Sequence, residues 1–184
     1  MKKLFVAIFA ILYFSHSFGQ KVAPIIVNGK AKLIATWNSK TSKKAIKNLL
    51  DNGDTLIMKL WQTVYIAVKH GKEETEIERI SELNEEGGLH SDSTVIEVYE
   101  YDFGDNGEKE IIVAYCSVFS LLHAQVFRQS GSLVKLIGNF SGQFEINLNK
   151  NIISFPIGSQ GISNDYLYKD GAFFQLAYHD PNKK

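Results

Sequence analysis

The chain has 184 residues, its 20 basic and 20 acidic residues give a formal net charge of zero at pH 7, and 45% of its residues are hydrophobic. This length suits one domain with a real hydrophobic core. Cys116 is the only cysteine, which excludes an internal disulfide, so the stability of the fold must come from packing.

The N-terminus has the pattern of a secretory signal peptide. Residues 1–3 are a short basic start, Leu4–Phe14 is an unbroken apolar run, and Ser17 and Gly19 are small residues two positions apart. The apolar run is shorter than the ~20 residues of a transmembrane helix. We therefore expect residues 1–19 to be a bacterial signal peptide. No cysteine follows the run directly, so we expect an exported protein that is not a lipoprotein.

Charge is unevenly distributed along residues 20–184, which we expect to form a single β-rich domain in the periplasm or outside the cell. Seven lysines and no acid lie between Lys21 and Leu50, whereas fourteen acids lie between Glu73 and Glu110. In a compact domain these two regions should attract each other, with partial screening by salt. A nucleic-acid site would need clustered lysines on one face, and export argues against it. We expect no nucleic-acid partner and no membrane span in this part of the chain.

The first elements predicted are a hairpin and a helix. Apolar segments on either side of Asn28-Gly29 predict a hairpin within residues 24–37, because Asn-Gly is a preferred dipeptide of two-residue turns. The next segment predicts the one helix of the chain, near residues 41–51, and Asn52-Gly53 supplies its C-terminal stop. The apolar face of that helix would consist of Ala45, Ile46, Leu49 and Leu50.

From residue 55 onward the chain has the composition of β-strands. Strand-like segments cover residues 55–61, 63–70, 94–103 and 108–119, and the last is apolar on both faces, which predicts a central strand. Residues 75–83 fit a strand slightly better than a helix. Gly131 and Gly171, forty residues apart, occupy the turns of two similar predicted hairpins.

The fold class that we expect is mainly β, because short strands at spacings of about eight to twelve residues predict an antiparallel meander. Such a meander could be a twisted sheet, an incomplete barrel or a partial propeller-like arrangement, with one short helix near residues 41–51. The forty-residue spacing fits propeller blades, but the early helix and the irregular front half argue against a closed propeller.

An acidic turn that contains glycine runs from Asp102 to Glu110 and leads into the predicted central strand. Calcium loops of the type D-x-D-x-D-G-x-x-E place oxygen ligands at alternate positions, bend at glycine and end on an acid. Asp102, Asn106, Gly107 and Glu110 match that pattern, whereas Gly104 lacks a side-chain oxygen. The alternative is a turn without metal, since Asp, Asn and Gly all tolerate the left-handed backbone conformation.

Residues 101–115, YDFGDNGEKEIIVAY, resemble the Asp-rich loop and following strand of FG-GAP and VCBS-type repeats, which occur in exported bacterial β-proteins and integrin-like propellers. The resemblance implies a binding or scaffold module in which Asp102, Asn106 and Glu110 are ligands of Ca²⁺. Family members usually carry an acid at the position of Gly104, so the resemblance implies a site with one ligand fewer.

Motifs of common catalytic sites are missing from the sequence. Ser159 stands in PIGSQG, which lacks the first glycine of a G-x-S-x-G nucleophile turn. The histidines at positions 70, 90, 123 and 179 show no metal-binding spacing. Glu97, Tyr99 and Asp102 could line a glycosidase-like cleft, although a solvated strand face is the ordinary explanation. The sequence therefore favours a protein without enzymatic activity.

Aromatic side chains are concentrated in the last predicted hairpin. Tyr166 and Tyr168 share one face of a strand, and Phe173 lies on the strand that follows. If that face is exposed, these three residues form a platform for a ligand or a protein partner. The alternative is the inner face of a sheet, where aromatic residues pack in the core.

Together these observations predict a small exported bacterial domain that binds a protein, a peptide or a glycan, as a periplasmic inhibitor or an immunity-type protein would. Ca²⁺ is the one candidate cofactor. Two alternatives stay open: an envelope hydrolase whose site is assembled from separate strands, and a structural module that is stabilised by Ca²⁺.

Overall fold

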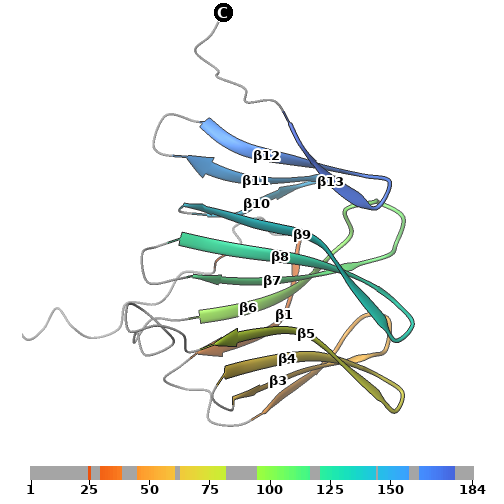
Figure 1. The fold of residues 1–184 in the computed structure, drawn as a ribbon. Coiled ribbons are helices and arrows are strands. Elements are labelled where there is room, and N and C mark those ends of the chain that lie inside the picture. Colours follow the sequence, from red (N-terminus) through yellow and green to blue (C-terminus); the bar gives the residue numbers. More distant parts are fainter. Residues whose placement is uncertain are drawn as a thin grey trace, which may run out of the picture.

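The structure is a computed structural model that describes Ile25 and residues 30–38, 45–60, 63–81, 95–116, 121–143, 145–157 and 162–176. All regular secondary structure in these residues is β, arranged as three antiparallel sheets (Figure 1). The prediction of a mainly β, antiparallel fold is confirmed, and none of the three described sheets closes into a barrel. No helix in the described ranges is long and apolar enough to cross a membrane. The predicted signal peptide and the Asn28-Gly29 turn lie outside these ranges.

Each sheet is an antiparallel meander. The first sheet contains β2 (Ile46–Leu49), β3 (Thr55–Leu60), β4 (Thr63–His70) and β5 (Glu73–Ser81). The middle sheet has the order β1-β6-β7-β8-β9 and contains β1 (Lys32–Asn38), β6 (Val95–Tyr101), β7 (Glu110–Cys116), β8 (Leu121–Ser130) and β9 (Leu133–Gln143). The third sheet contains β10 (Asn147–Asn149), β11 (Ile152–Ile157), β12 (Ile162–Lys169) and β13 (Ala172–Gln175). The chain thus leaves the middle sheet after β1, builds the whole first sheet, and returns with β6.

The three sheets stack on one another, with one hydrophobic core in each space between them (Figure 1). The core between the first and middle sheets includes Trp37, Met58, Ile66 and Phe127. The core between the middle and third sheets includes Phe103, Ile112, Leu148 and Phe155. The middle sheet is therefore buried on both faces. This confirms the predicted central strand, since residues 111–114 of β7 are at most 2% exposed.

The helix predicted near residues 41–51 is wrong over the part that the structure describes. Residues 46–49 form β2 and pair with β3, from Ile46 opposite Met58 to Leu49 opposite Thr55. Asn52-Gly53 closes a hairpin instead of a helix, with Gly53 at φ 89° and its N–H donating to Leu50 O at 3.0 Å. The apolar spacing was compatible with either structure, and pairing with a neighbouring strand decided between them.

Each sheet ends in a long hairpin with a two-residue turn. The glycines of these turns, Gly71, Gly131 and Gly171, have φ values of 59°, 60° and 83°, which a glycine adopts without steric cost. The predicted similarity between the hairpins around Gly131 and Gly171 is confirmed, and the β4–β5 hairpin around Gly71 shares their plan. All three turns lie at the same end of the stack (Figure 1), here called the hairpin end.

Candidate functional site

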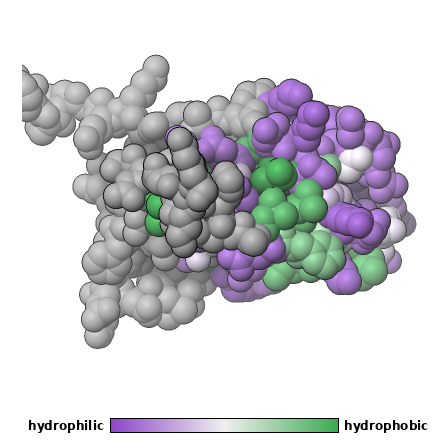
Figure 2. Space-filling model, turned by 90° about the horizontal axis from the view of Figure 1, so that it is seen from above, coloured by the Kyte–Doolittle hydropathy of each residue, from purple (hydrophilic) through white to green (hydrophobic). Residues whose placement is uncertain are grey.

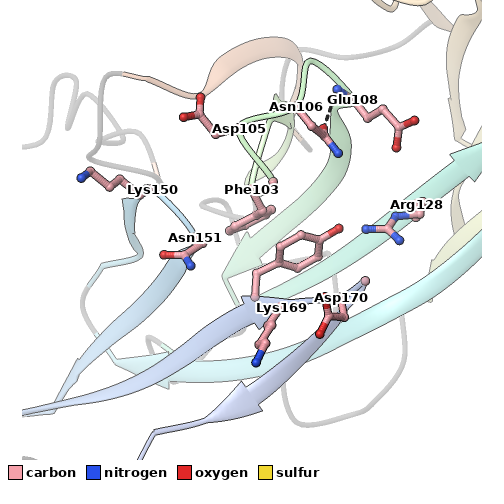
Figure 3. A pocket seen from close by; sticks show the side chains of 12 residues that line it. Phe103, Asp105, Asn106, Glu108, Arg128, Lys150, Asn151, Lys169 and Asp170 are labelled. Carbon is pink, nitrogen blue, oxygen red and sulfur yellow. Dashed lines mark hydrogen bonds between the residues drawn. The ribbon is translucent and has the colours of Figure 1, made fainter.

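A cavity of about 550 Å³ opens at the hairpin end, between the middle and third sheets (Figure 3). It is here called the loop cavity, because the loop between β6 and β7 forms one of its walls. The other walls come from Arg128 on β8, from the β10–β11 turn and from the β12–β13 turn. Four segments far apart in the sequence therefore converge on it, each held by a strand of a packed sheet.

The loop cavity is lined by equal numbers of basic and acidic side chains. The basic residues are Arg128, Lys150 and Lys169, and the acidic residues are Asp105, Glu108 and Asp170. Figure 3 shows Lys150 and Asp105 on one side of the cavity, and Arg128 and Glu108 on the other. Such a lining offers hydrogen-bond donors and acceptors without a strong field of either sign.

Glu110 lies buried beside this cavity, with only 3% of its surface exposed. Its Oε1 accepts hydrogen bonds from the Tyr168 hydroxyl at 2.6 Å and from Arg128 Nη2 at 3.1 Å, and its Oε2 accepts one from the Phe103 N–H at 3.3 Å. Burial raises the pKa of Glu110, and the Phe103 N–H and the Arg128 charge only partly oppose that shift. Glu110 thus joins the β6–β7 loop, β8 and β12.

The Arg128 guanidinium points into the loop cavity (Figure 3) and lies 5.4 Å from the centre of the Tyr168 ring. Gly171 makes room for it, because a Cβ at that position would come within 2.5 Å of Arg128 Nη1. The glycine therefore serves both the turn and the placement of the arginine. Arg128 is held on one side by Glu110 and on the other by Tyr168 and Gly171.

The predicted calcium ligands occupy two different environments. Asp102 accepts hydrogen bonds from the backbone N–H groups of Asn106 at 3.2 Å and Gly107 at 2.6 Å, and Asn106 Oδ1 accepts one from the Glu108 N–H at 2.9 Å. Glu110 instead faces the interior. No group of three or more metal-ligating side chains occurs within the residues that the structure describes. Ca²⁺ binding by Asp102, Asn106 and Glu110 stays a prediction.

Gly104, where the calcium pattern has an acid, lies under the side chain of Asn106. A Cβ added at Gly104 would lie 3.1 to 3.3 Å from three atoms of the Asn106 amide group. These distances are tighter than ordinary van der Waals contact, so an acid at this position would require Asn106 to move. The loop is packed around the glycine that the sequence carries.

The three predicted platform residues lie together on the face of the third sheet that packs against the middle sheet. Tyr168 is buried, and Tyr166 and Phe173 are partly buried against the same core. The Phe103 ring lies 5.5 Å from the Tyr168 ring and 5.0 Å from the Phe173 ring. This is the core placement that the sequence left open as the alternative to an exposed platform.

Glu97, a candidate for a glycosidase-like cleft, is also buried, with 5% of its surface exposed. Its Oε2 accepts a 2.7 Å hydrogen bond from the Ile25 N–H and another from the Tyr99 hydroxyl. The carboxylate thus fixes the chain before β1 to β6. Of the histidines considered for metal binding, His123 stacks on Tyr115 and burial lowers its pKa, whereas positions 90 and 179 and Ser159 lie outside the described residues.

Another buried acid, Asp54, which sequence reasoning missed, repeats the role of Glu110. Asp54, just before β3, contacts His70 Nδ1 at 2.9 Å in its own sheet and Gln129 in the middle sheet. Glu110, at the start of β7, likewise contacts Arg128 in its own sheet and Tyr168 in the third sheet. The sequence signal was an acid soon after Asp-Asn-Gly, since Asp54 follows residues 51–53 directly and Glu110 lies three residues after Gly107.

Comparisons of this chain with protein-family models, with curated proteins and with solved structures found no match.

Proposed function

We propose that this protein is an exported bacterial binding module without enzymatic activity, which holds a polar ligand at the loop cavity. The observation that carries the proposal is the convergence of four segments on one cavity with balanced charge. The ligand is a protein segment, a peptide or a glycan, and a periplasmic inhibitor or immunity-type protein is the kind of protein that works in this way. Export rests on the signal-peptide pattern of residues 1–19.

The position and size of the loop cavity support this proposal. Binding residues are commonly placed on loops that a rigid scaffold holds in position. A volume of about 550 Å³ falls in the range of pockets that enclose small molecules or short chain segments. The three basic and three acidic side chains of the lining favour a ligand that both donates and accepts hydrogen bonds, such as a peptide chain or a glycan.

We also infer that the three meanders are the blades of an open, propeller-like array. Each is an antiparallel sheet of four strands, apart from the additional β1, and adjacent sheets pack face to face. The loop that resembles FG-GAP and VCBS repeats connects the first two strands of the middle meander, β6 and β7. This arrangement supports an interaction module in preference to a closed catalytic barrel.

An envelope hydrolase is the runner-up, because Glu110 combines burial with a raised pKa beside a cavity, as catalytic acids do. Both of its oxygens already accept hydrogen bonds from the protein itself, which is what a structural role requires. A calcium-stabilised module, with Asp102, Asn106 and Glu110 as ligands, is the third candidate.

The proposal is tested by capturing ligands from envelope extract, and on peptide and glycan arrays, with the purified protein and two cavity variants. We expect Lys150→Glu and Asp105→Lys to weaken binding at least about tenfold, as the loss of one to two charged contacts predicts. Lys72→Glu makes the same change at the exposed β4–β5 turn and should bind like the wild type. Equal binding by all four proteins would refute the role of the loop cavity.

A further inference from the structure

The outer face of the third sheet carries a row of apolar side chains that crosses three strands. Ile152 on β11 is paired with Leu167 on β12, and Leu167 is paired with Phe174 on β13. Directly paired residues of antiparallel strands project on the same side. Their sequence neighbours Ile153 and Tyr166 pack in the core, so this row faces away from the middle sheet.

This row is accessible at the surface. Phe174 is 55% exposed and Leu176, which follows it on the same face, is 36% exposed, while Ile152 and Leu167 are half-buried. Figure 2 looks down on this side of the molecule and shows apolar side chains gathered next to a hydrophilic surface. We call Ile152, Leu167, Phe174 and Leu176 the apolar row.

The outer face of the first sheet, at the opposite end of the stack, carries charged pairs in place of an apolar row. At its centre the apolar residues Ile57 and Ala67 are only 3% and 0% exposed, whereas Leu49 on the edge strand β2 is 67% exposed. Around them Lys59 pairs with Glu74 at 2.9 Å and Arg79 with Glu76 at 2.6 Å. Repeat arrays need a polar outer face on a terminal unit to stay soluble. The first sheet has such a polar face over its centre, where the third sheet has the apolar row.

We propose that the apolar row is a dimer interface, in which the third sheets of two copies of this chain pack face to face. A two-fold axis brings the same patch of both copies together, so Phe174 and Leu167 meet their own equivalents. The centre of the first sheet's outer face is covered by charged pairs, and its exposed Leu49 lies on the edge strand β2. It therefore offers the row less apolar surface than a second row does, which disfavours head-to-tail stacking. Sheet-on-sheet packing is also how this chain builds both of its own cores.

The charges beside the row fix the orientation of the two copies. Asp165 and Lys169 lie on the same face of β12, two residues before and two residues after Leu167. A two-fold axis that runs across the strands at Leu167 makes the two β12 strands antiparallel and places each Asp165 opposite Lys169 of the other copy. The patch is therefore complementary to itself in charge as well as in hydrophobicity.

The size of the face predicts a weak dimer. The strands of the third sheet have three, six, eight and four residues. At about 3.3 Å per residue and about 4.8 Å between strands, they give a flat face of roughly 330 Å² per copy. Specific interfaces bury about 800 Å² per partner, and roughly 1,000 Å² in total is the lower limit. We therefore expect dissociation in the micromolar range and a monomer–dimer equilibrium that depends on concentration.

Sedimentation velocity of the protein, purified from cells that express the full sequence, tests this from about 5 µM to about 500 µM. The wild type should shift from monomer to dimer over this range. Phe174→Ser should raise the dissociation constant at least about tenfold, since it removes the most exposed member of the row. Leu133→Ser on β9 is the matched control, because Leu133 is 69% exposed but lies outside the third sheet, and it should dimerise like the wild type.

A charge exchange tests the orientation. Asp165→Lys places Lys against Lys and should weaken the dimer about tenfold, whereas Asp165→Lys combined with Lys169→Asp should bring the dissociation constant back to within about threefold of the wild type. A wild type that stays monomeric throughout, an equal loss in Leu133→Ser and Phe174→Ser, or a double variant as weak as the single one would each overturn the proposal.

Discussion

The Tyr168 hydroxyl donates a 2.6 Å hydrogen bond to the Glu110 carboxylate, across the boundary between the third and middle sheets. Asp54 makes the corresponding contact across the other boundary, where Gln129 donates to it. Each boundary at the hairpin end therefore contains a buried acid that is shared by two sheets. Glu100 is another at the boundary between the first and middle sheets, where it accepts a 2.8 Å hydrogen bond from the Asp51 N–H. A buried acid without hydrogen-bond partners lowers the stability of a fold. These contacts therefore make the stability of each sheet depend on its neighbour. Each contact can be tested by a separate substitution.

Tyr168→Phe should lower the free energy of unfolding by about 1–3 kcal/mol, since it removes a hydrogen bond to a buried carboxylate and leaves the ring in place. Urea denaturation followed by circular dichroism measures the loss. Tyr166→Phe is the matched control on the same strand and face, and we expect it to change stability by less than about 0.5 kcal/mol. Equal effects of the two variants would contradict the role assigned to the Tyr168–Glu110 contact.

Glu110 should make the stability of the fold depend on pH. Burial raises its pKa in the folded state, so the folded protein binds this proton more tightly than the unfolded chain does. The resulting stabilisation is complete below the unfolded pKa, which is about 4.3 for a glutamate, and is lost as pH rises through the raised folded pKa. The difference in unfolding free energy, Glu110→Gln minus wild type, should therefore increase from about pH 4 to pH 7.

That pH series is measured by urea denaturation at several pH values, with Glu108→Gln as the matched control. The control removes an exposed carboxylate of the same loop and reports the effect of losing one negative charge at the surface. For each variant, the quantity compared is its unfolding free energy minus that of the wild type. If this difference changes with pH by the same amount in both variants, the raised pKa of Glu110 is contradicted.

Gly171→Ala should be more harmful than a glycine-to-alanine change at another left-handed position. Gly171 and Gly107 have nearly equal φ values, 83° and 84°, but only at Gly171 would the new Cβ meet an atom, Arg128 Nη1 at 2.5 Å. Both variants carry the backbone cost of about 1 kcal/mol. We expect Gly171→Ala to lose up to about 1 kcal/mol more in thermal or urea unfolding, because the end of the Arg128 side chain must move from its contact with Glu110. A smaller loss than in Gly107→Ala would rule out the close approach.

Asp102→Ala should destabilise the β6–β7 loop whether or not calcium is present. The Asp102 carboxylate accepts two backbone N–H groups of its own loop, and losing such contacts costs about 1–2 kcal/mol. Melting curves in millimolar calcium and in chelator measure this. The calcium site would be favoured instead if Asp102→Ala were less stable than the wild type only in calcium, or if the melting temperature of the wild type fell on chelation.

Local features of the fold were predictable from the sequence. The apolar run around Ile112 identified the central strand, and the glycines at positions 131 and 171 identified two hairpin turns. The ambiguous segment of residues 75–83 forms a strand over most of its length, since β5 runs to Ser81. These signals succeed because side-chain alternation and left-handed turns act within a few residues.

The division into three sheets and the composition of the site were not predictable, because both depend on contacts between distant residues. Nothing local to Ile46–Leu49 shows that β3 will pair with it, and so the segment was predicted to be helical. Arg128, Glu110 and Tyr168 come from three strands, and each has an ordinary explanation when considered alone. Glu97 was expected on a solvated strand face because acids usually lie at the surface, whereas hydrogen bonds from the Ile25 N–H and the Tyr99 hydroxyl hold it inside. Glu110 was predicted as a calcium ligand, and its hydrogen bond from Tyr168 of the third sheet was not predictable.

The return of the chain to the middle sheet has a consequence for assembly. Lys32 in β1 pairs with Glu100 in β6, so all of β2–β5 is made before β1 obtains its partner. Contacts at such separation form slowly because a long loop must first close. A chain from which only residues up to 94 are available therefore leaves β1 without its partner strand. When β6 (Val95–Tyr101) arrives it pairs with β1, and the two strands together bring the first sheet against the middle sheet.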